Sequence, residues 1–433
     1  MQRLDVLLSS LKRLARRALV WIPVAGALAW SPSVYALQPL DEFVRGGRAR
    51  DPANHEAAAN TDAAEARADA ALGSALPGLT AAATYTRNQW EVLFGDLAVL
   101  PRNERNASVN VAVPLVDIAK FTRISAAQRS AEAATFRQEA IGRASEAQTV
   151  QLYYQLAADL TLVEVARHAL DVVLVNLKLT EQANSGGAAT SLDVARASAE
   201  VERQRQLLTS AELEVKLAAR ALASQTGVVA DISATVSLTD DLHREPALEH
   251  FATGLASTPA VRAATAERAA AERGATAQRL TLLPALTGNV NERYTNATGF
   301  LGGHDHAYAA AISLVWSVDF ATSPAIRARN AEAATARARE EQARLNIADA
   351  IFRAWSTVDA DLARSHSART QAAVSARAAE VARSRYRSGL GTQLDLIQAD
   401  RDAFAAEAGR IQADADLLNA RTQLRLVAGE TSP

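Results

Sequence analysis

Four short stretches of the chain alternate between apolar and small or polar residues. Residues 79–90 and 106–116 place apolar side chains at every second position, which is the period of a β-strand. Residues 286–294 and 308–318 show the same alternation in the second half of the chain. The pattern therefore predicts four strands. It is typical of strands with one face toward lipid and one toward water, and also of half-buried strands in a soluble protein.

Long stretches with a helical period separate these strands. Residues 122–183 contain no proline and would form a helix roughly 90 Å long. Further helices are expected over residues 191–226 and 324–387, and shorter ones over 40–50, 52–73 and 259–283. Apolar residues that recur every seven positions indicate coiled-coil seams. They are Leu156, Val163, Leu170 and Leu177 in the first half, and Ile397, Phe404, Ile411 and Leu418 in the second.

Two turns with the pattern Gly-x-x-Thr-x-Leu-Asp join these helices in pairs. Gly187 and Gly389 can adopt the positive φ that is needed where a helix ends and the chain reverses. The threonine can cap the next helix, and the acid in its first turn faces the positive end of the helix dipole. Each turn is therefore predicted to be the tip of a helical hairpin. The remaining motif residues are Thr190, Leu192 and Asp193 in the first tip and Thr392, Leu394 and Asp395 in the second.

The two tips belong to an internal repeat of about 200 residues. Gly187 and Gly389 are 202 positions apart, and Ala-Glu-Ala-Ala-Thr occurs at both 131–135 and 331–335. Such markers follow the same order in both halves, which predicts a duplication. The expected organisation is a signal peptide (1–36), a first repeat (37–227), an equatorial connector (228–250) with room for a short strand, and a second repeat (251–433).

The N-terminus and the composition narrow the class of protein. A basic start, an apolar stretch over residues 18–30 and the sequence Val34-Tyr35-Ala36 predict a secretory signal that is removed after Ala36. The alternative is a membrane anchor, although Pro23 interrupts the apolar stretch. The absence of cysteine excludes disulfides, thiol catalysis and cysteine metal sites, and a net charge of −2 gives no argument for nucleic acid.

Four strands are too few to close a transmembrane barrel, so copies of the chain would have to pool them. The chain resembles a TolC-type outer membrane factor, and the two tips carry most of this resemblance. The other features that carry it are the signal, the duplication, the Leu-Pro strand entries at 76–77 and 283–284, and the Val113-Pro114-Leu115 strand exit. The resemblance implies a mainly α fold with a small β part. Three chains would share a twelve-stranded transmembrane barrel, with four strands from each, that continues into an α-barrel of long coiled-coil helices through the periplasm.

The resemblance also implies roles for residues near the tips. Asp395 matches the position of a residue that forms an acidic ring at the entrance. Gln398 stands where the family often has a second acid. The alternative is that Asp395 is simply an acid at the start of a helix. Tyr386 matches a tyrosine that holds the entrance closed, with Asp193 as its acceptor, and Gly391 replaces a latching arginine, which predicts an entrance that opens more easily. The residues expected to dock a periplasmic adaptor, or to serve the turn alone, are Gly187, Thr190, Leu192, Gly389, Thr392 and Leu394.

Two functions from different classes fit these features. The first is a passive exit duct of a tripartite efflux pump or a type I secretion system, in which inner-membrane partners supply the energy and no cofactor is used. The second is a periplasmic coiled-coil scaffold or adaptor protein that never enters the membrane, and the four strands favour the duct over it. No catalytic motif is found, and His304-Asp305-His306 reads as a surface loop rather than a metal site.

Overall fold

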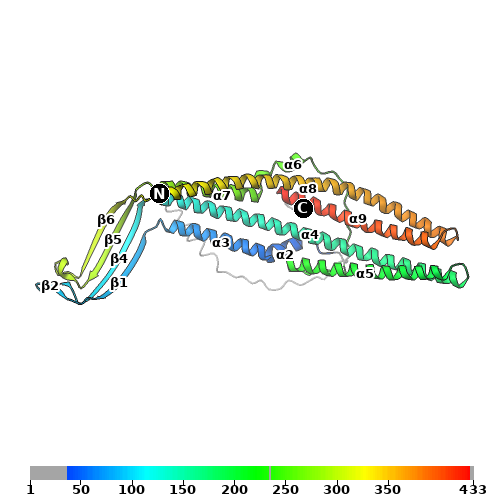
Figure 1. The fold of residues 1–433 in the computed structure, drawn as a ribbon, viewed down its shortest axis with the longest axis horizontal. Coiled ribbons are helices and arrows are strands. Elements are labelled where there is room, and N and C mark those ends of the chain that lie inside the picture. Colours follow the sequence, from blue (N-terminus) through cyan, green and yellow to red (C-terminus); the bar gives the residue numbers. More distant parts are fainter. Residues whose placement is uncertain (1–36, 234–235, 430–433) are drawn as a thin grey trace, which may run out of the picture. The chain divides into compact units, whose positions relative to one another are not determined.

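The computed structural model describes residues 37–233 and 236–429. The signal expected in residues 1–36 lies outside this part of the chain. Figure 1 shows long helices that run side by side, with the strands beyond one end of them and the helical hairpin tips at the other. The helices are α2 (Leu40–Arg50), α3 (Pro52–Gly73), α4 (Ile118–Ser185), α5 (Ser191–Thr226), α6 (Leu248–Ala252), α7 (Pro259–Leu280), α8 (Thr322–Arg387) and α9 (Gln393–Ala428).

Local signals in the sequence set most of these helix boundaries. Asp51 caps α3 by accepting a hydrogen bond from the Ala53 amide at 2.9 Å, and Pro52 occupies the first helical position. Gly227 and Gly429 end α5 and α9 in the left-handed conformation, at φ 72° and 91°. The predicted long helix is confirmed as α4, which is 68 residues long. Within the described residues, no helix is both long and apolar enough to cross a membrane.

The four predicted strands form one antiparallel sheet. They are β1 (Gly78–Arg87), β4 (Asn103–Val116), β5 (Ala285–Thr295) and β6 (His306–Val315), in the order β1-β4-β5-β6. The sheet joins the two halves of the chain where β4 pairs with β5, with Val111 opposite Val290. Strands β1 and β6 are the edges of this sheet, and the side chains of β1 are exposed along its whole length.

The structure corrects three details of the β prediction. The loop expected over residues 91–105 contains a hairpin of β2 (Val92–Phe94) and β3 (Leu97–Leu100), because Gly95 supplies a φ of 62° between two β-forming runs. The last strand ends at Val315 rather than at residue 318. Trp316 lies beyond the strand, and its indole donates a hydrogen bond to the Leu282 carbonyl at 3.0 Å. The described residues of the connector contain no strand.

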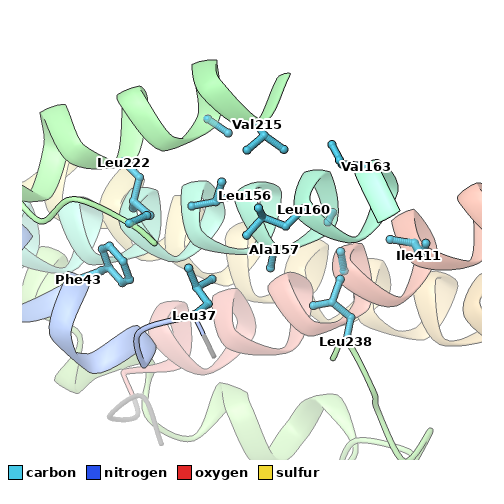
Figure 2. Close-up of a cluster of buried hydrophobic side chains, with 14 residues drawn as sticks. Leu37, Phe43, Leu156, Ala157, Leu160, Val163, Val215, Leu222, Leu238 and Ile411 are labelled. Carbon is cyan, nitrogen blue, oxygen red and sulfur yellow. The ribbon is translucent and has the colours of Figure 1, made fainter. Parts of the chain in front are cut away.

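A cluster of buried hydrophobic residues lies where α4, α5 and α9 meet α2 and the connector. Figure 2 shows Phe43 of α2, Leu156 of α4, Leu222 of α5 and Ile411 of α9 within one cluster, and all four side chains are fully buried. Leu238 of the connector belongs to the same cluster. Leu156 and Ile411 come from the two predicted heptad seams, so these seams contribute to one shared core.

A buried arginine of α9 fastens the connector to the helices. The Arg421 guanidinium donates to the Glu245 carboxylate at 2.5 Å and to the His243 carbonyl at 2.6 Å, and its Nε lies 3.0 Å from an Asp240 oxygen. Asp240, Asp241 and His243 could together hold a metal ion by their spacing. Arg421 already supplies a positive charge to Asp240, where a metal ion would otherwise do so. We therefore interpret the cluster as the contact that anchors the connector to α9.

Candidate functional site

The first tip closes with two hydrogen bonds around a left-handed glycine. Gly187 has a φ of 77°, as the sequence predicts for a residue that reverses the chain after a helix. Its amide donates to the Asn184 carbonyl at 3.0 Å, and the Ala188 amide donates to the Ala183 carbonyl at 2.8 Å. This pair of bonds is a Schellman motif, which satisfies the last carbonyls of α4 without another element.

The second tip has the same geometry. Gly389 has a φ of 76°, its amide donates to the Tyr386 carbonyl at 3.0 Å, and the Leu390 amide donates to the Arg385 carbonyl at 2.9 Å. The two turns, 202 positions apart in the sequence, therefore fold in the same way.

Each tip then starts its second helix with a capping box. The Thr190 hydroxyl accepts from the Asp193 amide at 3.2 Å, and the Asp193 carboxylate accepts from the Thr190 amide at 3.0 Å. Thr392 and Asp395 form the matching pair at 3.1 and 3.2 Å. The hydrogen bonds from the Thr392 side chain and backbone, with the charge of Arg385, lower the pKa of Asp395, so this carboxylate is ionised at neutral pH.

Both Thr392 bonds use Oδ2 of Asp395, which leaves Oδ1 outside the capping box. Asp395 is exposed, and so is Gln398 in the next turn of α9. In the structure Asp395 therefore caps the start of α9 through Oδ2, while its Oδ1 makes no hydrogen bond in the capping box.

The strain at the tips leads to a first prediction. A Cβ at Gly187 would meet no atom within 4 Å, so Gly187→Ala changes only the backbone energy. A left-handed L-residue costs about 1–2 kcal/mol, and we expect the free energy of local opening at this tip to fall by that amount. Gly186→Ala is the matched control, because Gly186 has a φ of −86° and its nearest atoms lie 3.7 Å away.

Native-state hydrogen exchange over residues 183–195 measures this difference. Faster exchange in Gly187→Ala alone supports the strain argument, and equal exchange in both variants contradicts it.

Gly391 allows the second tip to pack tightly. A Cβ at this position would lie 3.2 Å from both the Arg385 Cβ and the Tyr386 amide nitrogen, closer than nearly all such contacts. An arginine here would therefore push the start of α9 away from α8. Beside Gly391 lies an open groove of about 390 Å³, lined by Val381, Arg385 and Asp395 among others.

The structure brings Tyr386 to the first hairpin, although to a different partner from the expected one. Its hydroxyl lies 3.4 Å from the hydroxyl of Thr180 in α4. Asp193 pairs with Thr190, and with Arg196 at 3.9 Å. Among the hydrogen bonds of the described residues, none joins Tyr386 to Asp193. The expected docking residues Leu192 and Leu394 are 56% and 54% exposed, which leaves two large apolar side chains in solvent at the tips.

Sequence reasoning missed a set of polar contacts between the two hairpins behind the tips, in which the carboxylates of Glu200 and Asp400 are buried. Asn176 of α4 and Glu200 of α5 face Asp400 and Arg401 of α9 across the two hairpins. Asp400 lies three positions after the seam residue Ile397, and that spacing could have placed it on the packed face.

Several solved structures share this fold. The outer-membrane channel OprN is 23% identical, with a TM-score of 0.78 over 91% of this chain and 91% of its own. CusC is 14% identical, with a TM-score of 0.80 over 93% of this chain and 96% of its own. The outer membrane protein VceC from Vibrio cholerae is 18% identical, with a TM-score of 0.77 over 91% and 97%. At these identities the similarity establishes the fold, which is that of outer-membrane channel proteins.

The chain belongs to the outer membrane efflux protein family, whose model matches residues 47–228 and 253–430. This match confirms the resemblance to TolC-type factors, and the chain is accordingly an outer membrane efflux duct of a Gram-negative bacterium that extends into the periplasm. Members of the family are channels and serve as the outer membrane factors of tripartite pumps, with adaptor and transporter partners. No curated protein sequence matches this chain significantly.

Proposed function

We propose that three copies of this chain join their sheets, edge to edge, into one twelve-stranded barrel in the outer membrane. The observation that carries this proposal is the sheet with two free edges, β1 and β6. Bare edges expose unpaired backbone groups, and closing the sheet on itself through other copies removes them. The four strands are 10 to 14 residues long, which is enough to cross the hydrocarbon core when tilted.

The outward face of β6 has the chemistry that contact with lipid requires. Tyr308, Ile312 and Leu314 lie on one face of this strand and are 77%, 72% and 68% exposed. In water such a row of apolar side chains would be unfavourable, whereas in a bilayer it is stabilising.

Exposed apolar residues on the long helices support the same assembly. Leu345 and Phe352 of α8 are seven positions apart and more than half exposed, and so are Val374 and Val381. This spacing is that of a coiled-coil seam without a partner in the chain. Packing against neighbouring copies covers it and builds a helical tunnel through the periplasm.

The tips form the entrance of this tunnel, and Asp395 contributes one carboxylate per copy to a ring around it. The exposed Leu192 and Leu394, with the groove beside Gly391, form the surface on which a periplasmic adaptor docks. The chain is organised as two structural repeats, 37–227 and 251–433, joined by the connector 228–250. It acts as a conduit without catalytic activity or cofactor, and the inner-membrane partner determines whether small molecules or secreted proteins pass through it.

Single-channel conductance in a planar bilayer tests the proposal. We expect the wild type to insert and to conduct cations preferentially. Asp395→Asn removes the charge but keeps an oxygen for the cap, so we expect it to lose most of this preference. Asp193→Asn is the matched control, because it makes the same change in the first tip.

Equal cation selectivity in all three proteins would contradict the acidic ring at Asp395 but would still agree with a conduit. Folded protein that never inserts would overturn the conduit and favour the periplasmic scaffold.

A further inference from the structure

One row of residues crosses all four strands near the end of the sheet that lies away from the helices (Figure 1). The register of the sheet places Ala83, Ala107, Tyr294 and His306 opposite one another, in the order β1-β4-β5-β6. Residues directly opposite each other point to the same face of a sheet, and alternation along β6 puts this row on the face of Ile312. The row therefore belongs to the face that turns toward lipid in our proposal.

A hollow of about 690 Å³ opens on the sheet at this row. Its lining includes Ala83 and Ala107, whose side chains are single methyl groups, and the much larger Tyr85 and Tyr294. The two tyrosines are 62% and 53% exposed, and the Tyr85 hydroxyl donates to the side-chain oxygen of Asn103 at 2.9 Å. Methyl groups beside exposed aromatic rings form an apolar recess, which can receive a hydrocarbon chain.

The position of the row along the strands matches the edge of a bilayer. Strand β6 contains 10 residues from His306 to Val315. At 3.3 Å per residue and a tilt of about 40°, it crosses about 23 Å, close to the apolar band of about 25 Å in outer membrane barrels. Aromatic residues flank that band, and Tyr294 and Tyr308 occupy such positions. Because the helices extend into the periplasm from the other end, this edge lies in the outer leaflet.

Two arginines without a partner lie just beyond this edge. Arg105 is opposite Tyr85, and Arg87 is two residues further along β1, so both are on the outward face. Both are exposed, and neither guanidinium has a hydrogen bond or ion pair within the described structure. Asp305, the one acid among the described residues that line the hollow, is hydrogen-bonded to His306 at 3.0 Å instead.

The arrangement of the two arginines calls for an anion. Arg87 and Arg105 are diagonal neighbours, whose Cα atoms lie about 7–8 Å apart, so their charges repel each other. An anion between them removes this repulsion, and the oxygens of one phosphate can accept hydrogen bonds from both guanidinium groups.

We propose that the hollow binds a phosphate-bearing lipid of the outer leaflet, which in a Gram-negative outer membrane is lipopolysaccharide. One acyl chain lies over Ala83 and Ala107, and a phosphate of the headgroup lies between Arg87 and Arg105. The recess and the arginine pair are adjacent rows of one face, so a single lipid molecule reaches both. This inference rests on the proposed function, since it needs the outward face of the sheet to be in contact with lipid.

Thermal unfolding of the purified protein in detergent, with increasing amounts of added lipopolysaccharide, measures the binding. A ligand that binds only the folded state raises its stability with concentration, which yields an apparent Kd. A basic residue near an anionic lipid surface contributes about fivefold in affinity, so we expect Arg87→Gln with Arg105→Gln to bind about 25-fold more weakly.

Arg293→Gln is the matched control for the arginine pair. Arg293 is exposed and lies on the opposite face of the sheet, one residue before Tyr294, so it loses the same charge away from the hollow. We expect it to bind lipopolysaccharide as the wild type does. Circular dichroism before lipid is added identifies variants that fail to fold.

A second pair of variants tests the apolar recess. Ala107→Phe fills the space beside Tyr294 and is expected to weaken binding several-fold. Ala310→Phe is its control, because Ala310 is exposed on the same face of β6 and does not line the hollow. Two further probes are lipopolysaccharide without its phosphates and the deacylated, phosphorylated sugar, and we expect both to bind several-fold more weakly than the intact lipid. A deacylated sugar that bound as tightly as the intact lipid would overturn the acyl-chain site.

Conductance of the wild type in a planar bilayer separates this inference from the conduit. Equal affinity in the wild type and the double arginine variant would overturn the lipid site whether or not the protein conducts. A wild type that inserts and conducts, but gains no stability from lipopolysaccharide, would overturn the site and still agree with the barrel. Folded protein that neither inserts nor gains stability would overturn both.

Discussion

Ile312→Lys is expected to remove most of the folded protein from the outer membrane. Ile312 lies in the exposed apolar row of β6, and a lysine at the bilayer midplane costs about 2–4 kcal/mol in each copy. Since every 1.4 kcal/mol is tenfold in an equilibrium constant, the ratio of folded to unfolded protein falls by about 30-fold or more per copy. Immunoblots of membrane fractions, with heat-modifiable migration on gels as the sign of the folded assembly, measure this loss.

Ser313→Lys is the control for this experiment. Ser313 is the next residue of the same strand, so its side chain points to the opposite face of the sheet, which is the water-filled side in our proposal. We expect this variant to accumulate almost as the wild type does. Equal loss in both variants would show that β6 tolerates no charge on either face and would contradict a lipid-facing row at Ile312.

Arg421→Met is expected to destabilise the chain by about 3–5 kcal/mol. The guanidinium is 7% exposed and lies between the carboxylates of Asp240 and Glu245, which are 5% and 7% exposed. Removing the cation leaves the buried Asp240 without a charged partner and the buried Glu245 with only Arg425 at 3.9 Å, and the cost of such a change is much larger than the value of an exposed pair. The denaturant midpoint of the purified protein, followed by circular dichroism, measures the loss.

Arg425→Met, one turn further along α9, is the control. Arg425 is 32% exposed and lies 3.9 Å from Glu245, so its removal should cost at most about 1 kcal/mol. If Arg421→Met were no more destabilising than Arg425→Met, Arg421 would not be the anchor of the connector.

The helices could be predicted closely because capping residues, prolines and glycines near their ends determine where they begin and end. Asp51-Pro52 starts α3 where expected, and the two glycine tips take the left-handed conformation that their position after a helix requires. The strands were found by their alternation, but alternation does not mark where pairing stops. Strand β6 therefore ends at Val315, where the backbone ladder to β5 ends, although the apolar period continues to residue 318.

The polar contacts between the two hairpins behind the tips could not be predicted, because they join residues more than 200 positions apart. Asn176 and Asp400 each look like an ordinary polar residue on an alanine-rich helix, and only the packing of the two hairpins shows that they face each other. The contact between Tyr386 and Thr180 escapes prediction for the same reason, since Thr180 lies in no motif. The packing of neighbouring helices, rather than local propensity, decides such contacts.

The closed hydrogen bonding of each tip has a mechanical consequence. The turn and the cap satisfy their own backbone groups, so a tip can be displaced as a rigid piece without any backbone bond being broken. The distance along α9 from the core residue Ile411 to the tip at Gln393 is about 27 Å, at 1.5 Å per residue. The helix is then a lever arm, and a tilt of about 10° at the core moves the tip by about 5 Å. A pull on the tips is thereby transmitted to the core, where the displacement is smallest.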